Sequence, residues 1–425
     1  MSPSEFAAYV AIDWADRKHY WQLALSASSP REQGQLLNTP EAIDTWASGL
    51  QTRFQEGLIA VCLEQSRGSL VYQLTKYAQL VLFPVHPATI ASFRQAFFPS
   101  GAKGDPGDTA LLLDLLLHHR QRFRRLDPDT VETRQLLLFV ELRRRLVDER
   151  TRQSNRLTAW LKMYFPQALD WIDNIDSPLG CDFLQRWPTL QQLQRAQSGT
   201  VERFFREHNS RSLARIQERV EAIGVAVPAV QDAALLQAGA AATGSLVALL
   251  QALNGSIAST DRQIAEQLPP HPDAHLFAGL PGAGPVLLPR LIVAFGTRRD
   301  RFQSASELSA YSGIAPVTRQ SGQSKSVHFR LACPHFLRQT FHEFAAHSVA
   351  KSAWAREFYQ QRRDRGVHHH AAVRALAFKW IRILFRCWKD RTPYDEERYQ
   401  KALQQRRAPL PARLESTTSG ECIGD

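Results

Sequence analysis

A continuous apolar run at residues 58–63, Leu-Ile-Ala-Val-Cys-Leu, constrains the fold of this chain more than any other stretch. A strand that is apolar at every position is covered on both faces, as the central strands of an α/β sheet are. Other short β-rich runs lie at residues 9–13 and 80–85, and helical patterns begin at Pro40 and Pro87. This alternation predicts an α/β domain in the first part of the chain.

Further elements of the alternation follow from local patterns. A short polar turn joins residues 9–13 to residues 19–25, which is typical of a β-hairpin. We also expect a strand at residues 35–39 and helices at residues 69–77 and 87–97.

Four carboxylates stand at the ends of these expected elements. Asp13 ends the first run, Glu64 follows the central run, and Asp105 and Asp108 precede an apolar helical run at residues 111–117. Ligand sites gather at strand ends in an open α/β sheet. Acids that converge there would bind a hard, oxygen-liganded cation such as Mg²⁺.

The pair at residues 105 and 108 also has a simpler interpretation. Pro106 and Gly107 would form a turn, and Asp108 would cap the helix that follows. A single strand-end carboxylate is likewise common as a solvated turn residue. The metal interpretation therefore depends on all four acids together, and Lys103 beside them is a candidate contact to nucleic acid.

Two long helices are expected in the middle of the chain. Residues 131–165 contain no glycine or proline and carry leucines at helical spacing. Arg143, Arg144 and Arg145 are consecutive, so they cannot all face one way; we expect nucleic-acid contact from part of this charge and solvated surface from the rest. A second helix is expected at residues 229–268, and the two could pair as an antiparallel coiled coil or form a dimer interface.

The segment Pro-Pro-His-Pro at residues 269–272 breaks the second long helix and predicts a domain boundary. Residues 276–288 then resemble a helix-hairpin-helix. Gly282 and Gly284 would permit its tight turn and leave backbone N–H groups free for a phosphate. The alternative is a Gly-Pro loop between two core helices.

Residues 311–326 contain a Ser-Gly pair, Ser321 and Gly322, among basic residues. A serine hydroxyl attacks phosphorus only when a base, a cation or a metal activates it. Arg319, Lys325 and Arg330 surround this pair and could hold a phosphate. Without that role, the Ser-Gly pair is an ordinary loop.

Charge and cysteine usage limit the partners and the compartment. The formal net charge is +11, and only nine of the 52 basic residues are lysine, so arginine suited to bidentate phosphate contact dominates. A GC-rich genome gives the same bias, and charge alone makes a polyanion partner an expectation. Five scattered cysteines argue against a zinc module or disulfide scaffold and for a reducing cytoplasm. We find no export signal and expect no apolar run long enough to span a bilayer.

Three consecutive histidines, residues 368–370, lie in an expected helix. Adjacent side chains on a helix point in different directions. Polar surface or a phosphate contact is therefore expected here rather than a metal site.

The order of these motifs resembles a known family. Ala-Ile-Asp13 with its hairpin, Leu-Glu64-Gln-Ser-Arg-Gly, and Lys103-x-Asp105-x-x-Asp108 resemble the RuvC-like (RNase H fold) domain of the DEDD insertion-sequence transposases, the bridge-RNA-guided recombinases. The resemblance implies that the four acids form the metal site. Thr109 departs from it, since alanine is expected after the last acid.

The later motif resembles the carboxy-terminal transposase domain of the same family. Its Gly-x-x-Pro…Ser-Gly pattern falls on Gly313, Pro316, Ser321 and Gly322, which implies that Ser321 is a nucleophile, with Ser324 and Ser326 close by. The resemblance also implies that the acids of one protomer serve the serine of another in a homodimer or homotetramer. It further implies a guide RNA encoded by the element.

We therefore expect a multi-domain chain. A RuvC-like α/β domain would occupy residues 7–127, a helical and coiled-coil region residues 128–268, a mostly α transposase domain residues 269–405, and a disordered tail residues 406–425. The expected function is that of a transposase that cuts and rejoins DNA by phosphoryl transfer with Mg²⁺. A RuvC-like nuclease that uses water and a non-enzymatic nucleic-acid-binding protein are the alternatives.

Overall fold

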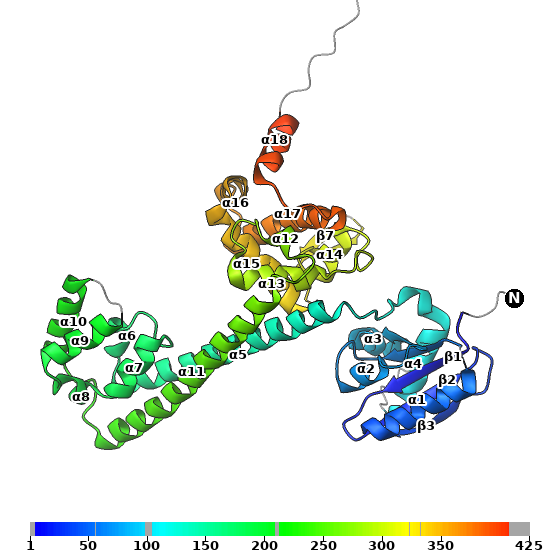
Figure 1. Cartoon of the computed structure of the whole chain (residues 1–425), viewed down its shortest axis with the longest axis horizontal. Coiled ribbons are helices and arrows are strands. Elements are labelled where there is room, and N and C mark those ends of the chain that lie inside the picture. The colour runs from blue at the N-terminus through cyan, green and yellow to red at the C-terminus, as the bar shows by residue number, and fades with distance from the viewer. Residues whose placement is uncertain are drawn as a thin grey trace, which may run out of the picture. The chain divides into compact units, whose positions relative to one another are not determined.

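The computed structural model describes residues 5–55, 57–97, 104–208, 212–322, 324–331 and 333–407. Lys103 and the tail from residue 408 lie outside these ranges, and so do the side chains of Asp105 and Lys325. The chain forms two compact units, Met1–Pro128 and Asp129–Asp425, which Figure 1 colours blue to cyan and cyan to red. The boundary expected at residue 269 lies inside the second unit.

The first unit is built on one mixed sheet of five strands. They are β1 (Ala8–Asp13), β2 (Lys18–Ala24), β3 (Glu32–Leu37), β4 (Ile59–Leu63) and β5 (Leu80–Pro84), in the order β3-β2-β1-β4-β5. The expected hairpin is present, because β1 pairs antiparallel with β2. On its other edge β1 pairs parallel with β4, and β4 pairs parallel with β5.

Helices cover both faces of this sheet. They are α1 (Pro40–Phe54), α2 (Ser69–Leu74), α3 (Pro87–Phe97) and α4 (Asp105–His119). Side chains of α1 and α2 pack with Val10 and Ile12 on one face, whereas side chains of α3 and α4 pack with Ala11 and Cys62 on the other. Every residue of β4 is buried, as its uninterrupted apolar sequence predicts. The expected α/β alternation is confirmed.

The start of α4 differs from the turn that we expected at Pro106 and Gly107. Gly104 is the N-cap, and the helix begins at Asp105 with proline in its first turn. Proline is well placed there because its missing N–H is one that a helix leaves unpaired at this end. The predictions of a turn at Pro106 and Gly107 and of a capping role for Asp108 were therefore wrong. Asp108 lies inside the first turn of the helix.

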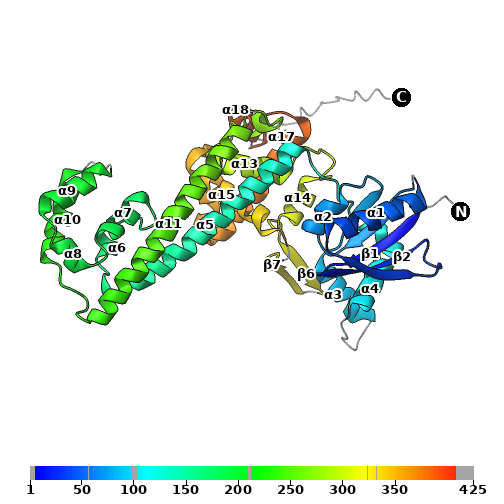
Figure 2. The ribbon, with the colours of Figure 1, turned by 60° about the horizontal axis from the view of Figure 1, so that its bottom comes forward.

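Two long helices dominate the second unit, α5 (Val131–Tyr164) and α11 (Ala233–Gln267). They run antiparallel along each other, as both views show (Figures 1 and 2). The Tyr164 hydroxyl meets the Thr243 hydroxyl at 2.7 Å at one end, and Arg143 forms an ion pair with Asp261 towards the other. At Gly239 a Cβ would lie 2.6 Å from the Tyr164 ring, so only glycine allows this close approach. The expected pairing is confirmed; supercoiling and a dimer interface stay predictions.

Helix α11 also corrects an expectation about membranes. It is long and apolar enough to cross a bilayer by length and composition, the single helix of this kind in the described part of the chain. No charged residue occurs between Asp232 and Asp261, because alanine, glycine and serine fill the gaps between the leucines. Helices that pack inside proteins meet the same criterion, and α11 packs along α5.

Five short helices lie between the two long ones and share a core of their own. They are α6 (Ala168–Trp171), α7 (Pro178–Arg186), α8 (Leu190–Gln194), α9 (Ser198–Glu207) and α10 (Leu213–Val225). An aromatic cluster holds them together, with Phe183 5.5 Å from Trp187 and 5.9 Å from Phe204 between ring centroids. The side chain of Thr189 caps α8 by accepting from the backbone N–H of Gln192.

The remaining helices surround an aromatic core. They are α12 (Ala274–Phe277), α13 (Gly284–Phe295), α14 (Ala305–Tyr311), α15 (His335–Lys351), α16 (Ala353–Asp364), α17 (His369–Asp390) and α18 (Glu396–Arg407). A two-stranded hairpin, β6 (Val317–Ser321) and β7 (Ser324–His328), accompanies them. Leu136 of α5 and Ile264 of α11 belong to the same core, so the long helices are anchored in it.

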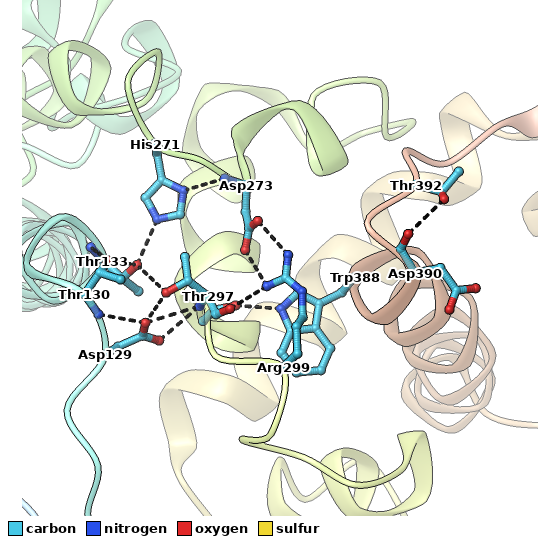
Figure 3. Close-up of polar contacts among 11 residues, drawn as sticks. Asp129, Thr130, Thr133, His271, Asp273, Thr297, Arg299, Trp388, Asp390 and Thr392 are labelled. Atoms are coloured by element: carbon cyan, nitrogen blue, oxygen red, sulfur yellow. Dashed lines mark hydrogen bonds and ion pairs between the residues drawn. The ribbon is translucent and has the colours of Figure 1, made fainter.

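A buried polar network joins the start of α5 to the Pro-rich segment that we expected to be a boundary (Figure 3). The amide of Asp273 donates to His271 Nδ1 at 3.2 Å, so Nε2 is left to donate to Thr133 Oγ1 at 3.0 Å. Burial lowers the pKa of His271, with nearby carboxylates opposing the shift. Asp129 accepts from the amide of Thr297 at 3.1 Å. The segment is therefore held inside the unit.

The network continues to α17. Arg299 makes a bidentate ion pair with Asp273 at 2.7 and 2.6 Å, and its guanidinium lies 5.0 Å from the centre of a Trp388 ring. Trp388 in turn donates its indole N–H to the carbonyl of Gly296 at 2.6 Å. The carboxylate of Asp273 and the indole N–H of Trp388 thus have partners, as burial of such groups demands, whereas the buried Nε of Arg299 has none among the described residues.

Candidate functional site

Two of the four predicted acids lie side by side at the carboxyl ends of β1 and β4, which are neighbouring strands inside the sheet. Strands β1 and β4 are parallel, and Ile12 pairs with Leu63. The next residue on each strand is therefore Asp13 and Glu64, on strands that lie about 4.8 Å apart. Both carboxylates are partly buried. Burial and the charge of Glu64 raise the pKa of the Cys62 thiol.

Helix α4 brings Asp108 to the same side of the sheet. The side-chain amide of Gln22 on β2 donates to the carbonyl of Pro106 at 3.1 Å, and Gln22 pairs with Ala11 on β1. The first turn of α4 therefore lies over these strands. The Asp108 side chain is only 8% exposed, and Arg94 of α3 donates to it at 2.6 Å.

These positions fit a divalent cation only in part. Neighbouring carboxylates at Asp13 and Glu64 supply the oxygen donors that Mg²⁺ prefers. Within the described residues, however, no three His, Cys, Asp or Glu side chains gather closely enough to hold a metal. Arg94 neutralises Asp108, and the side chain of Asp105 is outside the described set. The four-acid site stays a prediction that requires Asp108 to exchange Arg94 for the ion.

The predicted nucleophile lies on the β6–β7 hairpin. Ser321 pairs with Ser324, and Arg319 pairs with Ser326. Because paired residues and alternate residues of a strand share a face, all four side chains lie on one face, with His328 two residues beyond Ser326. These residues are exposed. The strands meet at Gly322, whose φ of +56° favours glycine.

Sequence analysis overlooked His328. Its Nε2 lies 2.9 Å from the hydroxyl of Ser326. Among the described residues, Ser326 is the one of the three candidate serines whose hydroxyl meets an imidazole. The sequence spacing could have indicated this contact. Ser324, Ser326 and His328 are two residues apart, as residues on one face of a strand are. A loop was our alternative interpretation of the Ser321-Gly322 pair, and no strand was expected here.

The other residues of the motif hold the hairpin in place. Gly313 has a φ of +73°, and a Cβ there would collide with the side chain of Cys333. The carbonyl of Arg330 accepts from Arg338 of α15 at 3.2 Å. Lys325 pairs with Gln320, so its register position is on the opposite face from Ser321.

The glycine turn before α13 borders a cavity of about 660 Å³. Gly282 has a φ of +85° and Gly284 a φ of +54°, and a Cβ at Gly282 would lie 2.9 Å from the backbone of His347 on α15. Lys351 and His347 of α15 line the cavity together with both glycines. A helix start beside two basic side chains is suited to an anion.

The three consecutive arginines of α5 have different surroundings. Arg143 pairs with Asp261 on α11, and Arg144 pairs with Asp148 at 2.8 Å and lies 3.6 Å from Glu343. Arg145 is exposed. Part of this charge therefore stabilises helix packing, and a nucleic-acid contact by Arg145 stays a prediction.

Two profiles of known families match the chain. One, described as a transposase of the DEDD type, matches residues 10–166, and one described as transposase, IS116/IS110/IS902 family, matches residues 274–360. The first span includes the four predicted acids, and the second includes Ser321 and His328. The class of protein that they define is a DNA transposase.

Within that class, the chain belongs to the IS116/IS110/IS902 family. It is 26% identical to a protein of the IS117 mini-circle from Streptomyces coelicolor, over 94% of this chain and 98% of that one. It is also 26% identical to the uncharacterized 42 kDa protein of the insertion element IS900 from Mycobacterium paratuberculosis, over 91% and 96% of the two chains. A shorter match, 33% identical, covers 28% of this chain and 33% of a pilin gene-inverting protein from Moraxella bovis.

Proposed function

We propose that this transposase cuts and rejoins DNA by transferring a phosphoryl group to a serine of the β6–β7 hairpin, with Ser321 as the nucleophile. The observation that supports the proposal is the exposed hairpin face shared by Ser321, Arg319 and His328. It supplies an alcohol at Ser321, a cation for a phosphate oxygen at Arg319 and, at the other end of the face, an imidazole that meets Ser326.

The reaction would proceed in two balanced steps. The serine oxygen bonds to phosphorus as the bond from phosphorus to one DNA oxygen breaks, and the hydroxyl proton passes to a base, which for Ser321 must come from outside the hairpin because His328 lies at its far end. The departing oxygen takes up a proton. A second DNA hydroxyl then attacks the phosphoserine and restores the serine. Arg319 would stabilise the charge on the non-bridging oxygens in both steps.

Asp13, Glu64, Asp105 and Asp108 would hold Mg²⁺ in this proposal. When bound, the ion supplies neutralisation of the charge that develops on the phosphate oxygens. The adjacent strand ends of Asp13 and Glu64 support it. The strand order β3-β2-β1-β4-β5, with its amino-terminal hairpin, is consistent with the RuvC-like RNase H fold that the sequence resemblance implies.

The proposed assembly is a homodimer or homotetramer in which the acids of one protomer serve the serine of another. The formal net charge of +11 supports nucleic-acid partners, which we take to be DNA and an element-encoded guide RNA. Gly282, Gly284, Arg319 and Arg330 are proposed contacts, together with Lys103, Lys325 and the α5 arginines. The name of the Moraxella bovis relative describes inversion of a gene, which favours rejoining over simple cleavage.

One observation favours a second nucleophile. Ser326 already has an imidazole within hydrogen-bond distance, at 2.9 Å, the arrangement by which a base activates a serine. Ser326 shares its face with Ser321, so either hydroxyl could approach a phosphate bound to Arg319.

Trapping a covalent protein–DNA adduct tests the proposal. Purified chain would be incubated with labelled element-end DNA, guide RNA and Mg²⁺, and then denatured. We expect an adduct that Ser321→Ala abolishes and Ser324→Ala retains. Loss with Ser326→Ala alone would move the nucleophile to Ser326. Cleavage without any adduct would indicate a nuclease that uses water, and absence of Mg²⁺-dependent cleavage would indicate a protein that only binds nucleic acid.

A further inference from the structure

A second basic cavity lies at the base of the β6–β7 hairpin, between α15 and α17. It has a volume of about 450 Å³. Its lining includes Arg338, His335 and His342 from α15 and Arg374 and His370 from α17. None of these residues belongs to the proposed catalytic face.

The two arginines hold an aromatic ring between them. The guanidinium carbon of Arg338 lies 4.7 Å from the centre of the Phe329 ring, and that of Arg374 lies 4.8 Å from it. Phe329 follows β7 directly and is 40% exposed. Arg338 Nη1 donates to the carbonyl of Arg330 at 3.2 Å. We expect the other N–H groups of the two guanidinium groups to serve a ligand with planar or bidentate oxygens.

The charge of the cavity is positive even when its histidines are neutral. Its one carboxylate, Glu343, is already engaged by the buried Arg290 and by Gln339, whose amide donates at 2.7 Å. Arg144 lies 3.6 Å from the same carboxylate. Glu343 therefore does not neutralise Arg338 and Arg374, and an anion would be needed to do so.

The histidines add a proton-dependent charge. The His342 and His370 rings are 5.5 Å apart between centroids. Burial lowers the pKa of His342, and His370, Arg374 and His369 lower it further, while Glu343 opposes them. The described residues offer no group of three metal-binding side chains here. The His342 ring is thus poised to take up a proton when a negative charge enters.

We propose that this cavity binds a backbone phosphate of DNA, with Arg338 and Arg374 as the ligands and His342 as a proton-linked partner. The choice of DNA rests on the proposed function. The cavity adjoins the end of β7, and five hairpin residues at about 3.3 Å each separate that end from Ser321. A phosphate held there would fix the DNA strand about 17 Å from the serine, on the order of five base-pair steps.

DNA binding by the full chain tests the cavity without requiring any chemistry. Fluorescence anisotropy with a labelled duplex would be measured from about 50 to 200 mM salt. Arg374→Gln and Arg338→Gln should each reduce the slope of log affinity against log salt by about 0.9, the value for one phosphate. Arg374→Lys keeps a cation over Phe329 and should retain most of the slope.

Arg382→Gln is the matched control, because it removes the same charge from an exposed position on the same helix. Equal slopes for Arg382→Gln and Arg374→Gln would overturn the proposal, and so would no change in either. A change with single-stranded RNA but not with duplex DNA would overturn the assignment to DNA. Competition by inorganic phosphate at equal potency in wild type and Arg374→Gln would also contradict the site.

The pH dependence supplies an independent readout. Affinity should rise as pH falls from about 8 to 6, by at most tenfold per pH unit for each proton taken up. Replacing His342 with Asn should flatten this profile, and an unchanged profile would count against its role. Ser321→Ala should keep both the slope and the profile. If Ser321→Ala abolishes DNA joining but leaves DNA binding intact, the result supports the nucleophile without bearing on the cavity. The two proposals can therefore fail independently.

Discussion

Arg94 and Asp108 form an ion pair at 2.6 Å in which the carboxylate is 8% exposed and the guanidinium side chain 21%. The partner of one predicted metal ligand is thus a cation of the same chain. An ion and Arg94 cannot both neutralise this carboxylate fully, so they compete for it.

Replacing Arg94 with Gln should free Asp108 for a divalent cation. We expect a loss of about 1–3 kcal/mol in the free energy of unfolding without metal, because a mostly buried carboxylate loses its partner. Mg²⁺ should then raise the melting temperature of Arg94→Gln more than that of wild type. Arg31→Gln is the control, since it breaks a more exposed ion pair with Asp114 on the same helix. Equal Mg²⁺ responses in all three proteins would remove Asp108 from the metal site.

Gly282→Ala should destabilise the carboxy-terminal unit. The φ of +85° and a Cβ 2.9 Å from the backbone of His347 both oppose a side chain. We expect about 2–4 kcal/mol, from backbone strain plus overlap. Gly284→Ala has a φ of +54° and nothing within 4 Å of its Cβ, so it should cost only the strain, about 1 kcal/mol. Urea unfolding compares the two, and equal losses would contradict the close contact.

Buried His271 should make stability decrease in mild acid. Its folded pKa lies below the ordinary value of 6.5, so the unfolded chain binds a proton that the folded chain does not. This contribution is complete above pH about 6.5 and is lost as pH falls towards the folded pKa, at most 1.4 kcal/mol per pH unit. His271→Gln should reduce the slope of melting temperature against pH between about 7 and 5. A slope identical to wild type would show that His271 is protonated in the folded state.

His328 should matter to the chemistry more than to the fold. His328→Asn removes the imidazole from the hydroxyl of Ser326. If Ser326 is the nucleophile, loss of this general base should cost about 10²- to 10⁴-fold in rate, whereas attack by Ser321 should change little. Gln320→Ala is the control, because Gln320 belongs to the opposite face of the exposed hairpin. The rate of adduct formation is the measurement. A rate loss shared equally by both variants would point to hairpin stability instead.

Substitutions at Arg143 and Arg145 should distinguish a role in helix packing from a role in DNA binding. Arg143→Gln breaks the ion pair with Asp261 across α5 and α11, and because both partners are partly exposed we expect at most about 1 kcal/mol of destabilisation. Arg145→Gln should leave stability unchanged and lower DNA affinity with a smaller salt slope. The reverse pattern would mean that the exposed arginine has no nucleic-acid partner.

Local sequence patterns predicted much of the fold, because many of its helices and strands can be recognised from a few consecutive residues. The buried strand β4, the hairpin of β1 and β2, and helix α3 occur where periodicity and proline placed them. The β6–β7 hairpin was overlooked because its exposed strands have no apolar alternation. Long-range partners were invisible for a different reason. Nothing near Asp108 in the sequence indicates Arg94, and nothing near His271 indicates Thr133, since both contacts arise from tertiary packing.

The antiparallel pairing of α5 and α11 has a consequence for how this family can vary. Both helices have one end packed in the same aromatic core, through Leu136 of α5 and Ile264 of α11. The chain therefore leaves this core along α5 and returns to it along α11. Adding one matched turn to each helix would shift the cluster of α6 to α10 outward by about 5.4 Å while the root stays as it is. Evolution could therefore tune the length of this pair of helices without rebuilding the aromatic core at its base.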